Sequence, residues 1–172
     1  MLKSSFYQHN FNDLKELLIS NALNPASASL LYKHHYKEKN TSKCEHHNLS
    51  KKAREFVSEN FDFTLPEIEL IHESEDQTVK FLVKLADGQK VESVLIPFQS
   101  KYTICLSTQV GCAMKCSFCF TGTQGLKRHL GTEEIIGQFI LAWNWLKKNR
   151  PDDHQLKNIV YMGQGEPLHN FD

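Results

Sequence analysis

Four of the five cysteines of this chain lie within fifteen residues, and this crowding constrains the fold more than any other feature. The five are Cys44, Cys105, Cys112, Cys116 and Cys119. The number is odd and the first residues lack the apolar run of a secretory signal, which argues against a disulfide framework. Crowded cysteines in a cytosolic chain favour a metal site or redox chemistry.

The segment CAMKCSFC, residues 112–119, separates its three cysteines by three and then two residues. Such short gaps allow one loop to place several thiolates around a compact metal centre, and three cysteines on a [4Fe–4S] cluster leave one iron open to a small chelating molecule. A zinc site is the alternative, and it needs a fourth ligand such as His129 or a residue of the group Cys44, His46 and His47. Three unligated core cysteines are the third interpretation.

Hydrophobic periodicity divides the chain into a helical first part and a second part that contains strands. Helices are predicted over residues 12–21, 25–36, 50–60 and 132–148, with Asn12 and Thr132 as caps of the first and last. Strands are predicted over residues 67–73, 78–86, 90–96, 102–107 and 158–162. The order strand, loop, helix, strand from 102 to 162 is that of a βαβ unit, so we expect an α/β fold.

Asp87-Gly88 is a strong signal for a two-residue hairpin turn. In that register Glu92 lies opposite Val83 and shares an apolar face with residues such as Phe81. A carboxylate on an apolar face has a raised pKa and accepts a proton near neutrality, which makes Glu92 a candidate general base. A slip of one residue reverses the face and leaves Glu92 as an edge residue in solvent.

Two segments of the chain resemble the RlmN/Cfr group of radical S-adenosylmethionine (SAM) enzymes, namely CLSTQVGCAMKCSFCFTGTQGLKRHLGTEEIIGQF and NIVYMGQGEPLHNFD. That group methylates carbon 2 or carbon 8 of an adenine in RNA. The resemblance, close over residues 80–172, implies a helical accessory domain (1–60) with a possible RNA contact, a β-hairpin linker region (61–100), and the start of a partial (β/α) radical-SAM barrel (101–172).

The resemblance also implies a cofactor site. Cys112, Cys116 and Cys119 match the ligands of the [4Fe–4S] cluster, and Gly165 and Glu166 fall in a Gly-Glu-Pro motif that contacts SAM in the family. Glycine permits a close backbone approach, and a carboxylate after a strand can bind the SAM amino group. A simple turn at the end of a strand is the alternative interpretation of this motif.

Two further residues match catalytic positions of the family. Cys105 matches a cysteine that assists breakdown of the enzyme–RNA adduct, and Glu92 lies in VESVLIP, which resembles the segment of the general base. A buried strand cysteine is the alternative for Cys105. In the family, one SAM methylates an enzyme cysteine and a second supplies the radical that activates this methyl group. The implied partners are rRNA or tRNA with an unstacked adenine, and an electron donor such as flavodoxin.

The charge distribution bears on RNA binding. The chain has 20 basic and 20 acidic residues, which argues against binding nucleic acid through overall charge. Residues 101–150 nevertheless carry seven basic and two acidic side chains, and Lys115, Lys127, Arg128 and His129 surround the cysteines. They could hold RNA phosphates, with a solvated loop as the alternative.

Two expectations concern the whole protein. No stretch approaches about 18 consecutive apolar residues, so we expect no transmembrane helix and a cytoplasmic location. No cysteine follows Cys119, so the methyl-carrying cysteine is missing, and we expect an incomplete, inactive fragment of a longer parent. A zinc-binding RNA-interaction module without catalysis is the alternative function.

Overall fold

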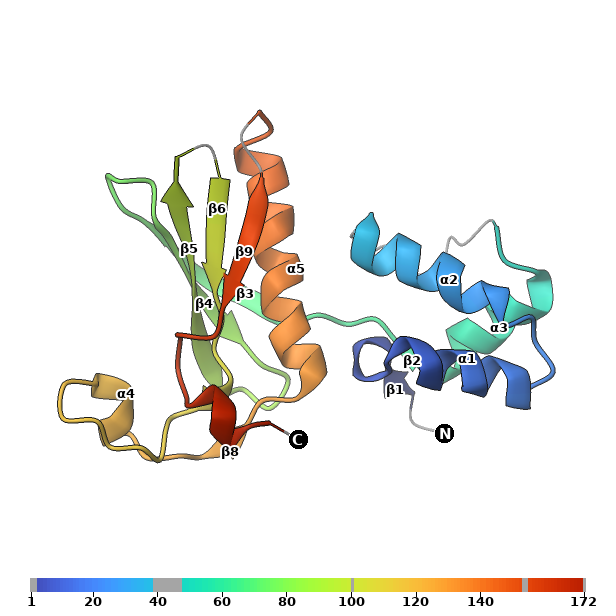
Figure 1. The fold of residues 1–172 in the computed structure, drawn as a ribbon, viewed down its shortest axis with the longest axis horizontal. Helices are drawn as coiled ribbons and strands as arrows, with labels where there is room; N and C mark the ends of the chain where they lie inside the picture. The colour runs from blue at the N-terminus through green and yellow to red at the C-terminus, as the bar shows by residue number, and fades with distance from the viewer. Residues whose placement is uncertain (1–2, 39–47, 100, 153–154, 172) are drawn as a thin grey trace. The chain divides into compact units, whose positions relative to one another are not determined.

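The computed structural model describes residues 3–38, 48–99, 101–152 and 155–171 (Figure 1). Cys44, His46 and His47, three predicted candidates for a zinc ligand, lie outside the described residues. The chain divides into two compact units, Met1–Thr64 and Leu65–Asp172, and each is described by itself. No helix in the described ranges is long and apolar enough to cross a membrane.

The first unit is helical, as the sequence predicts for residues 1–60. It contains β1 (Ser4–Ser5), η1 (Phe6–Gln8), α1 (Phe11–Ser20), α2 (Ala26–Tyr32), the π-helical turn η2 (Lys33–Lys37), α3 (Lys51–Asn60) and β2 (Phe61–Asp62). Helix α1 is capped by Asn10, whose Oδ1 accepts the N–H of Asp13 at 3.0 Å, so the predicted cap at Asn12 is wrong by two residues. An aromatic core forms around Phe6, which stacks on Phe63 with ring centroids 5.0 Å apart.

The second unit is built on a five-stranded sheet of order β3-β4-β5-β6-β9 (Figure 1). Its strands are β3 (Glu67–Glu73), β4 (Val79–Lys84), β5 (Lys90–Phe98), β6 (Lys101–Cys105) and β9 (Leu156–Val160). The first four are antiparallel neighbours, and β9 pairs in parallel with β6. Residues 61–100 therefore supply three strands of the same sheet to which residues 101–172 contribute two.

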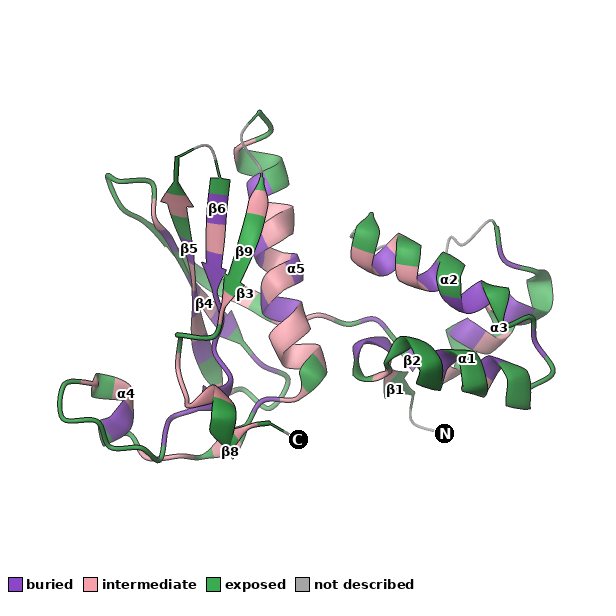
Figure 2. Cartoon of the chain, in the orientation of Figure 1, coloured by how far each residue is buried: buried purple, intermediate pink, exposed green. Residues whose placement is uncertain are grey.

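Helix α5 (Thr132–Asn149) joins β6 to β9 and completes the predicted βαβ unit. It covers one face of the sheet, where Phe81 and Trp145 pack with ring centroids 5.7 Å apart. Figure 2 shows buried residues recurring along β6 and α5. The cap of α5 is Gly131, whose N–H donates to Glu134 Oε2 at 2.9 Å, so the prediction of Thr132 as the cap is wrong.

Four short elements lie beyond the end of the sheet. They are β7 (Gln109–Val110) with its partner β8 (Arg128–His129), α4 (Phe120–Thr123) and η3 (Pro167–His169). All of them lie in the segments that follow β6 and β9. This edge of the sheet therefore carries additional short elements besides the regular strands and helix.

The hairpin between β4 and β5 has a turn of three residues, and the predicted two-residue turn is wrong. The Leu85 N–H donates to Gln89 O at 2.8 Å, and Gly88 takes a φ of 81°. This geometry is that of a type I turn followed by a left-handed glycine. The extra turn residue shifts the register by one, so that Glu92 pairs with Leu82 and not with Val83.

Candidate functional site

The loops that follow the two parallel strands meet at one edge of the sheet. Cys105 at the end of β6 pairs with Val160 at the end of β9, so both carboxyl ends lie together. Beyond them, the N–H groups of Thr108 and Gln109 donate to Gln164 O at 2.8 and 3.2 Å. Segments nearly sixty residues apart in sequence are thereby hydrogen-bonded side by side.

The segment Gly-Gln-Gly-Glu-Pro, residues 163–167, is called the glycine loop here. Its backbone is bonded to the chain that leaves β6: Gly163 N donates to Leu106 O at 3.1 Å, and Gln164 N donates to Ser107 Oγ at 2.9 Å. A β-carbon at Gly163 would lie 2.8 Å from Leu106 backbone atoms. Glycine is therefore needed for the close approach of the two backbones.

The predicted SAM-binding pair lies in this loop. Gly165 has a φ of 105°, and a β-carbon there would lie 2.6 Å from Gln109 Cβ. The N–H of Glu166 donates to Gln109 Oε1 at 2.9 Å, and Glu166 Oε1 accepts the N–H of Leu168 at 3.0 Å, which caps η3. The Gly-Glu-Pro motif is thus a tightly held turn at the end of a strand.

A buried polar network that the sequence analysis missed supports this arrangement. Gln138 of α5 is 1% exposed; its Oε1 accepts from Ser93 Oγ at 2.7 Å and from Ser107 N at 3.0 Å. Its Nε2 donates to Ser107 O at 3.1 Å. Ser107 Oγ in turn donates to Glu92 O at 2.6 Å. A polar residue on an otherwise apolar helix face was the one available signal.

The cysteine loop, residues 111–119, is more open. Cys112 is buried, Cys116 exposed and Cys119 intermediate. The N–H of Cys112 donates to Gly125 O at 3.2 Å, and that of Cys119 donates to Cys116 O at 3.0 Å. Hydrogen bonding from the backbone of Gly122 is the main cause that lowers the pKa of the Cys119 thiol, which favours the thiolate that binds metals.

The donor set of this loop fits an iron–sulfur cluster in its chemistry, since thiolates are the usual ligands of such clusters. Among residues 3–38, 48–99, 101–152 and 155–171, no three His, Cys, Asp or Glu side chains are grouped closely enough to hold a metal ion. For the zinc alternative, the candidate ligand His129 has its Nδ1 3.1 Å from Gln109 Nε2.

Cys105 is the last residue of β6, where it pairs with Val94 of β5. It is 8% exposed, and burial raises the pKa of its thiol, against the opposing effect of the Met162 backbone N–H. The protonated thiol of Cys105 is therefore the favoured form at neutral pH.

Glu92 lies in an environment different from the predicted one. The shifted register takes it off the apolar face, and its carboxylate lies 3.0 Å from Lys80 Nζ with a side chain 41% exposed. Because Glu92 is two residues from Val94, it shares with Cys105 the sheet face opposite α5. The prediction of an apolar setting for Glu92 is wrong, but the two candidate catalytic residues face the same side.

The predicted RNA-contacting residues differ in their surroundings. Arg128 donates to Asp87 at 2.8 Å and to both carboxylate oxygens of Glu134 at 2.7 and 2.8 Å. These carboxylates raise the pKa of Arg128 further. Lys127 Nζ donates to Gln89 Oε1 at 3.1 Å. Both basic residues hold the turn of the β4–β5 hairpin against β8.

Lys115 and His129 are the other two predicted contacts, and both are exposed. Lys115 lies within the cysteine loop and has a φ of 52°, in the left-handed region. His129 packs edge-on against His169, with ring centroids 5.2 Å apart. The basic residues therefore surround the loop, but they do not form one free cationic patch.

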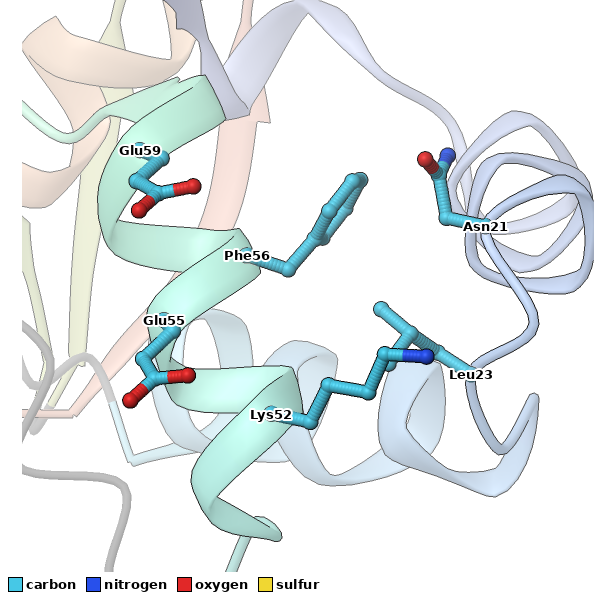
Figure 3. Close-up of a pocket in the computed structure, with 6 residues that line it drawn as sticks. All are labelled: Asn21, Leu23, Lys52, Glu55, Phe56 and Glu59. Atoms are coloured by element: carbon cyan, nitrogen blue, oxygen red, sulfur yellow. The ribbon is translucent and has the colours of Figure 1, made fainter.

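A separate pocket of about 230 Å³ lies in the helical unit (Figure 3). It is lined by Asn21, Leu23, Lys52, Glu55, Phe56 and Glu59. None of the site residues predicted from sequence lines it, so the candidate site remains the edge where the glycine loop is bonded to the segment that enters the cysteine loop.

A solved structure defines the class of protein. A crystal structure of a radical SAM methyltransferase from Sphaerobacter thermophilus matches 98% of this chain with a TM-score of 0.84 and 31% identity, over 49% of its own length. No family model matches the chain. The mixed α/β fold of this chain, with a cysteine loop after one strand and a Gly-Glu-Pro turn after the next, is therefore similar to that of about half of a radical SAM methyltransferase.

Sequence relatives narrow the class. The dual-specificity RNA methyltransferase RlmN of Nitratidesulfovibrio vulgaris (strain DP4) is 49% identical over 129 residues, which is 72% of this chain and 35% of the relative. The protein of the same name from Bdellovibrio bacteriovorus is 40% identical over 166 residues, 96% of this chain and 41% of the relative. The chain thus spans less than half the length of these relatives, and over that part it is similar to the RlmN methyltransferases, as its motifs predicted.

Proposed function

We propose that this chain is part of an RNA methyltransferase that methylates carbon 2 or carbon 8 of an adenine in rRNA or tRNA by radical-SAM chemistry. The names of the relatives support an RNA substrate. The observation that carries the proposal is the direct bonding of the glycine loop to the segment entering the cysteine loop, through Gln164 O. Chemistry that needs both loops can take place only where they meet.

In this proposal Cys112, Cys116 and Cys119 bind a [4Fe–4S] cluster, and Gly165 and Glu166 bind SAM. Bound there, the cluster and SAM supply the radical and the methyl group. The protein contributes a glycine loop held by hydrogen bonds to the chain leaving β6, and the Glu166 carboxylate would bind the amino group of SAM. The lowered pKa of Cys119 favours its thiolate as a ligand.

Glu92 and Cys105 act on the RNA side of the reaction. We assign to Glu92 the removal of a proton and to Cys105 the breakdown of an enzyme–RNA adduct; their position on one sheet face supports a shared substrate. The Glu92 carboxylate lies 3.0 Å from Lys80 Nζ, and a carboxylate is the form of this side chain that accepts a proton. Burial raises the pKa of Cys105, so its thiol must lose a proton when it acts.

The RNA itself would approach the open cysteine loop. We assign to Lys115, Lys127 and His129 the contacts with its phosphates. Arg128 would have to release two carboxylates to do so, and we assign it a supporting role at the hairpin turn. The reaction also needs a cysteine that carries the methyl group and an electron donor such as flavodoxin. We propose no residue of this chain for either role.

Anaerobic reconstitution tests the cofactor site. The full chain is incubated with iron and sulfide, and its absorption and electron paramagnetic resonance (EPR) spectra are recorded with and without SAM. We expect about four irons per chain and a spectrum that SAM perturbs. Cys112→Ala should abolish the cluster, whereas Cys105→Ala, a matched change outside the loop, should retain it.

Two results would contradict the proposal. A colourless protein that binds zinc in place of iron would favour a zinc-binding RNA-interaction module. A cluster whose spectrum does not change when SAM is added would show that the glycine loop does not bind SAM beside the cluster. It would contradict the role proposed for Glu166.

A further inference from the structure

Gln109 lies at the centre of the contacts between the glycine loop and the segment that enters the cysteine loop, although no catalytic motif marks it. It is 0% exposed, and its side-chain Oε1 accepts the N–H of Glu166 at 2.9 Å. Its Nε2 lies 3.1 Å from His129 Nδ1 and 3.4 Å from His169 Nδ1. One amide therefore joins the glycine loop to a histidine on each side of it.

The chemistry of these partners fixes the orientation of the amide. A backbone N–H can only donate, so the atom that faces Glu166 must be the amide oxygen. The amide nitrogen then faces both histidines and can only donate to them. Each imidazole must accept at Nδ1, and each is consequently the neutral tautomer that carries its proton on Nε2.

The body of the Gln109 side chain also shapes the loop. A β-carbon at Gly165 would lie 2.6 Å from Gln109 Cβ and 2.8 Å from its Cγ, so glycine and glutamine fit against one another. Gln109 thus contacts both residues to which SAM binding is assigned: Gly165 through its aliphatic part and Glu166 through its amide.

We propose that Gln109 is a positioning residue of the SAM site, which holds Gly165 and Glu166 in their ligand-binding conformation and is itself oriented by His129 and His169. This inference rests on the proposed function for its ligand and deepens it. Gln109 does not touch SAM. It acts through the glycine loop, and the two histidines, exposed at the surface, determine which way its amide points.

Two variants of nearly equal size separate positioning from mere space-filling. Gln109→Glu keeps an oxygen acceptor for the Glu166 N–H, and both histidines can move their proton to Nδ1 and donate to the new carboxylate. Gln109→Leu fills the same space and provides no acceptor. A purely structural role would make the leucine variant the better tolerated, since it buries no charge.

The readout is hydrogen exchange of the Glu166 amide in the full chain, followed by nitrogen-15 nuclear magnetic resonance (NMR) without iron or SAM. We expect exchange at least about fivefold faster in Gln109→Leu, because a buried hydrogen bond is lost, and within about twofold of wild type in Gln109→Glu. The Nδ1 signals of His129 and His169 should report an unprotonated nitrogen in wild type and a protonated one in Gln109→Glu.

If Gln109→Leu fails to fold, the double variant His129→Leu, His169→Leu tests the inference instead. Both positions are exposed, so we expect this variant to fold. It removes the acceptors that orient the amide, and Glu166 exchange should rise, by less than in Gln109→Leu. Unchanged exchange in every folded variant, or wild-type histidines protonated at Nδ1, would overturn the inference.

A SAM titration of the reconstituted chain, followed by EPR, then separates this inference from the proposed function. Weaker SAM binding in Gln109→Leu, with an unaltered cluster signal before SAM is added, supports both. If the hydrogen-exchange results are as expected but SAM does not change the EPR spectrum of the wild-type chain, Gln109 holds the glycine loop, and the SAM site is refuted. SAM binding that is equal in wild type and Gln109→Leu overturns the positioning role.

Discussion

The glycine loop and the cysteine loop follow neighbouring parallel strands, but the protein holds them in different ways. The backbone N–H groups of Gly163, Gln164 and Glu166 donate to partners on the chain leaving β6, and Gly163 and Gly165 pack against that chain. In the cysteine loop, Phe118 is 91% exposed and Met114 46% exposed. One loop is ordered by the fold, whereas the other presents side chains to the outside.

This difference corresponds to two ways of building a cofactor site. A site for an organic ligand binds more tightly when its surface is already rigid, because less conformational entropy is then lost on binding. A metal cluster can organise its own ligands, since its bonds to thiolates are strong enough to order a loop. The comparison therefore predicts that substitutions around the glycine loop reduce stability, and that substitutions in the cysteine loop do not.

The largest effect is expected for Gln138→Ala. It leaves buried groups of Ser93 and Ser107 without partners, each at about 1–3 kcal/mol, so the free energy of unfolding should fall by at least about 3 kcal/mol. Urea denaturation of the chain measures it. Gln124→Ala, an exposed glutamine beside the cysteine loop, is the control and should change little. A loss below about 1 kcal/mol for Gln138→Ala would contradict this account of the network.

Gly165→Ala comes next, at about 2–3 kcal/mol, because a left-handed backbone and a collision with Gln109 act together. Gly125→Ala is its matched control next to the cysteine loop: Gly125 has a φ of 70° but no atom within 4 Å of the added β-carbon. It should lose only the backbone contribution, about 1 kcal/mol. Equal losses in urea denaturation would show that contact with Gln109 is unimportant.

Thiol reactivity should differ by about tenfold between the loop and the strand. Alkylation requires the thiolate, whose fraction rises with pH; hydrogen bonding lowers the pKa of Cys119, whereas burial raises that of Cys105. Cys119 should therefore reach half its maximal rate with iodoacetamide at a lower pH than Cys105. Peptide mass spectrometry of the iron-free chain follows both sites, and identical pH profiles would refute the assignment.

The smallest effect is expected for Phe118→Ser. A side chain that is 91% exposed contributes little to folding, so the free energy of unfolding should stay within about 0.5 kcal/mol of wild type. Phe81→Ala in the sheet core, 1% exposed, should lose about 3–5 kcal/mol and shows that the assay can detect a lost aromatic ring. A large loss at Phe118 would mean that the cysteine loop, too, is held by the fold.

Sequence patterns predicted the elements better than their register. The strand at residues 67–73 was predicted with the bounds that β3 has, because alternation along one strand is a local property. The setting of Glu92 was wrong, because register depends on a turn whose length two residues, Asp87-Gly88, do not determine. The bonds of Gln138 to Ser93 and Ser107 join three separate elements, so no local pattern could have indicated them.

The cysteines and the Gly-Glu-Pro motif were found because the residues that define each motif lie close together in the sequence. Gln109 was not, although it lies three residues before Cys112, because its importance arises from contacts with Glu166 and His169 far along the chain. Motifs indicate the groups that carry chemistry, whereas the groups that hold them in place emerge only when distant segments are brought together.

The three-residue turn between β4 and β5 makes its residues unequally open to substitution. Gly88 takes a φ of 81°, in the left-handed region that glycine adopts without strain, and Asp87 pairs with Arg128 of β8 at 2.8 Å, whereas Ala86 is exposed. The turn therefore joins the hairpin to the segment that follows the cysteine loop. Substitutions at Ala86 should therefore be tolerated better than substitutions at Gly88 or Asp87.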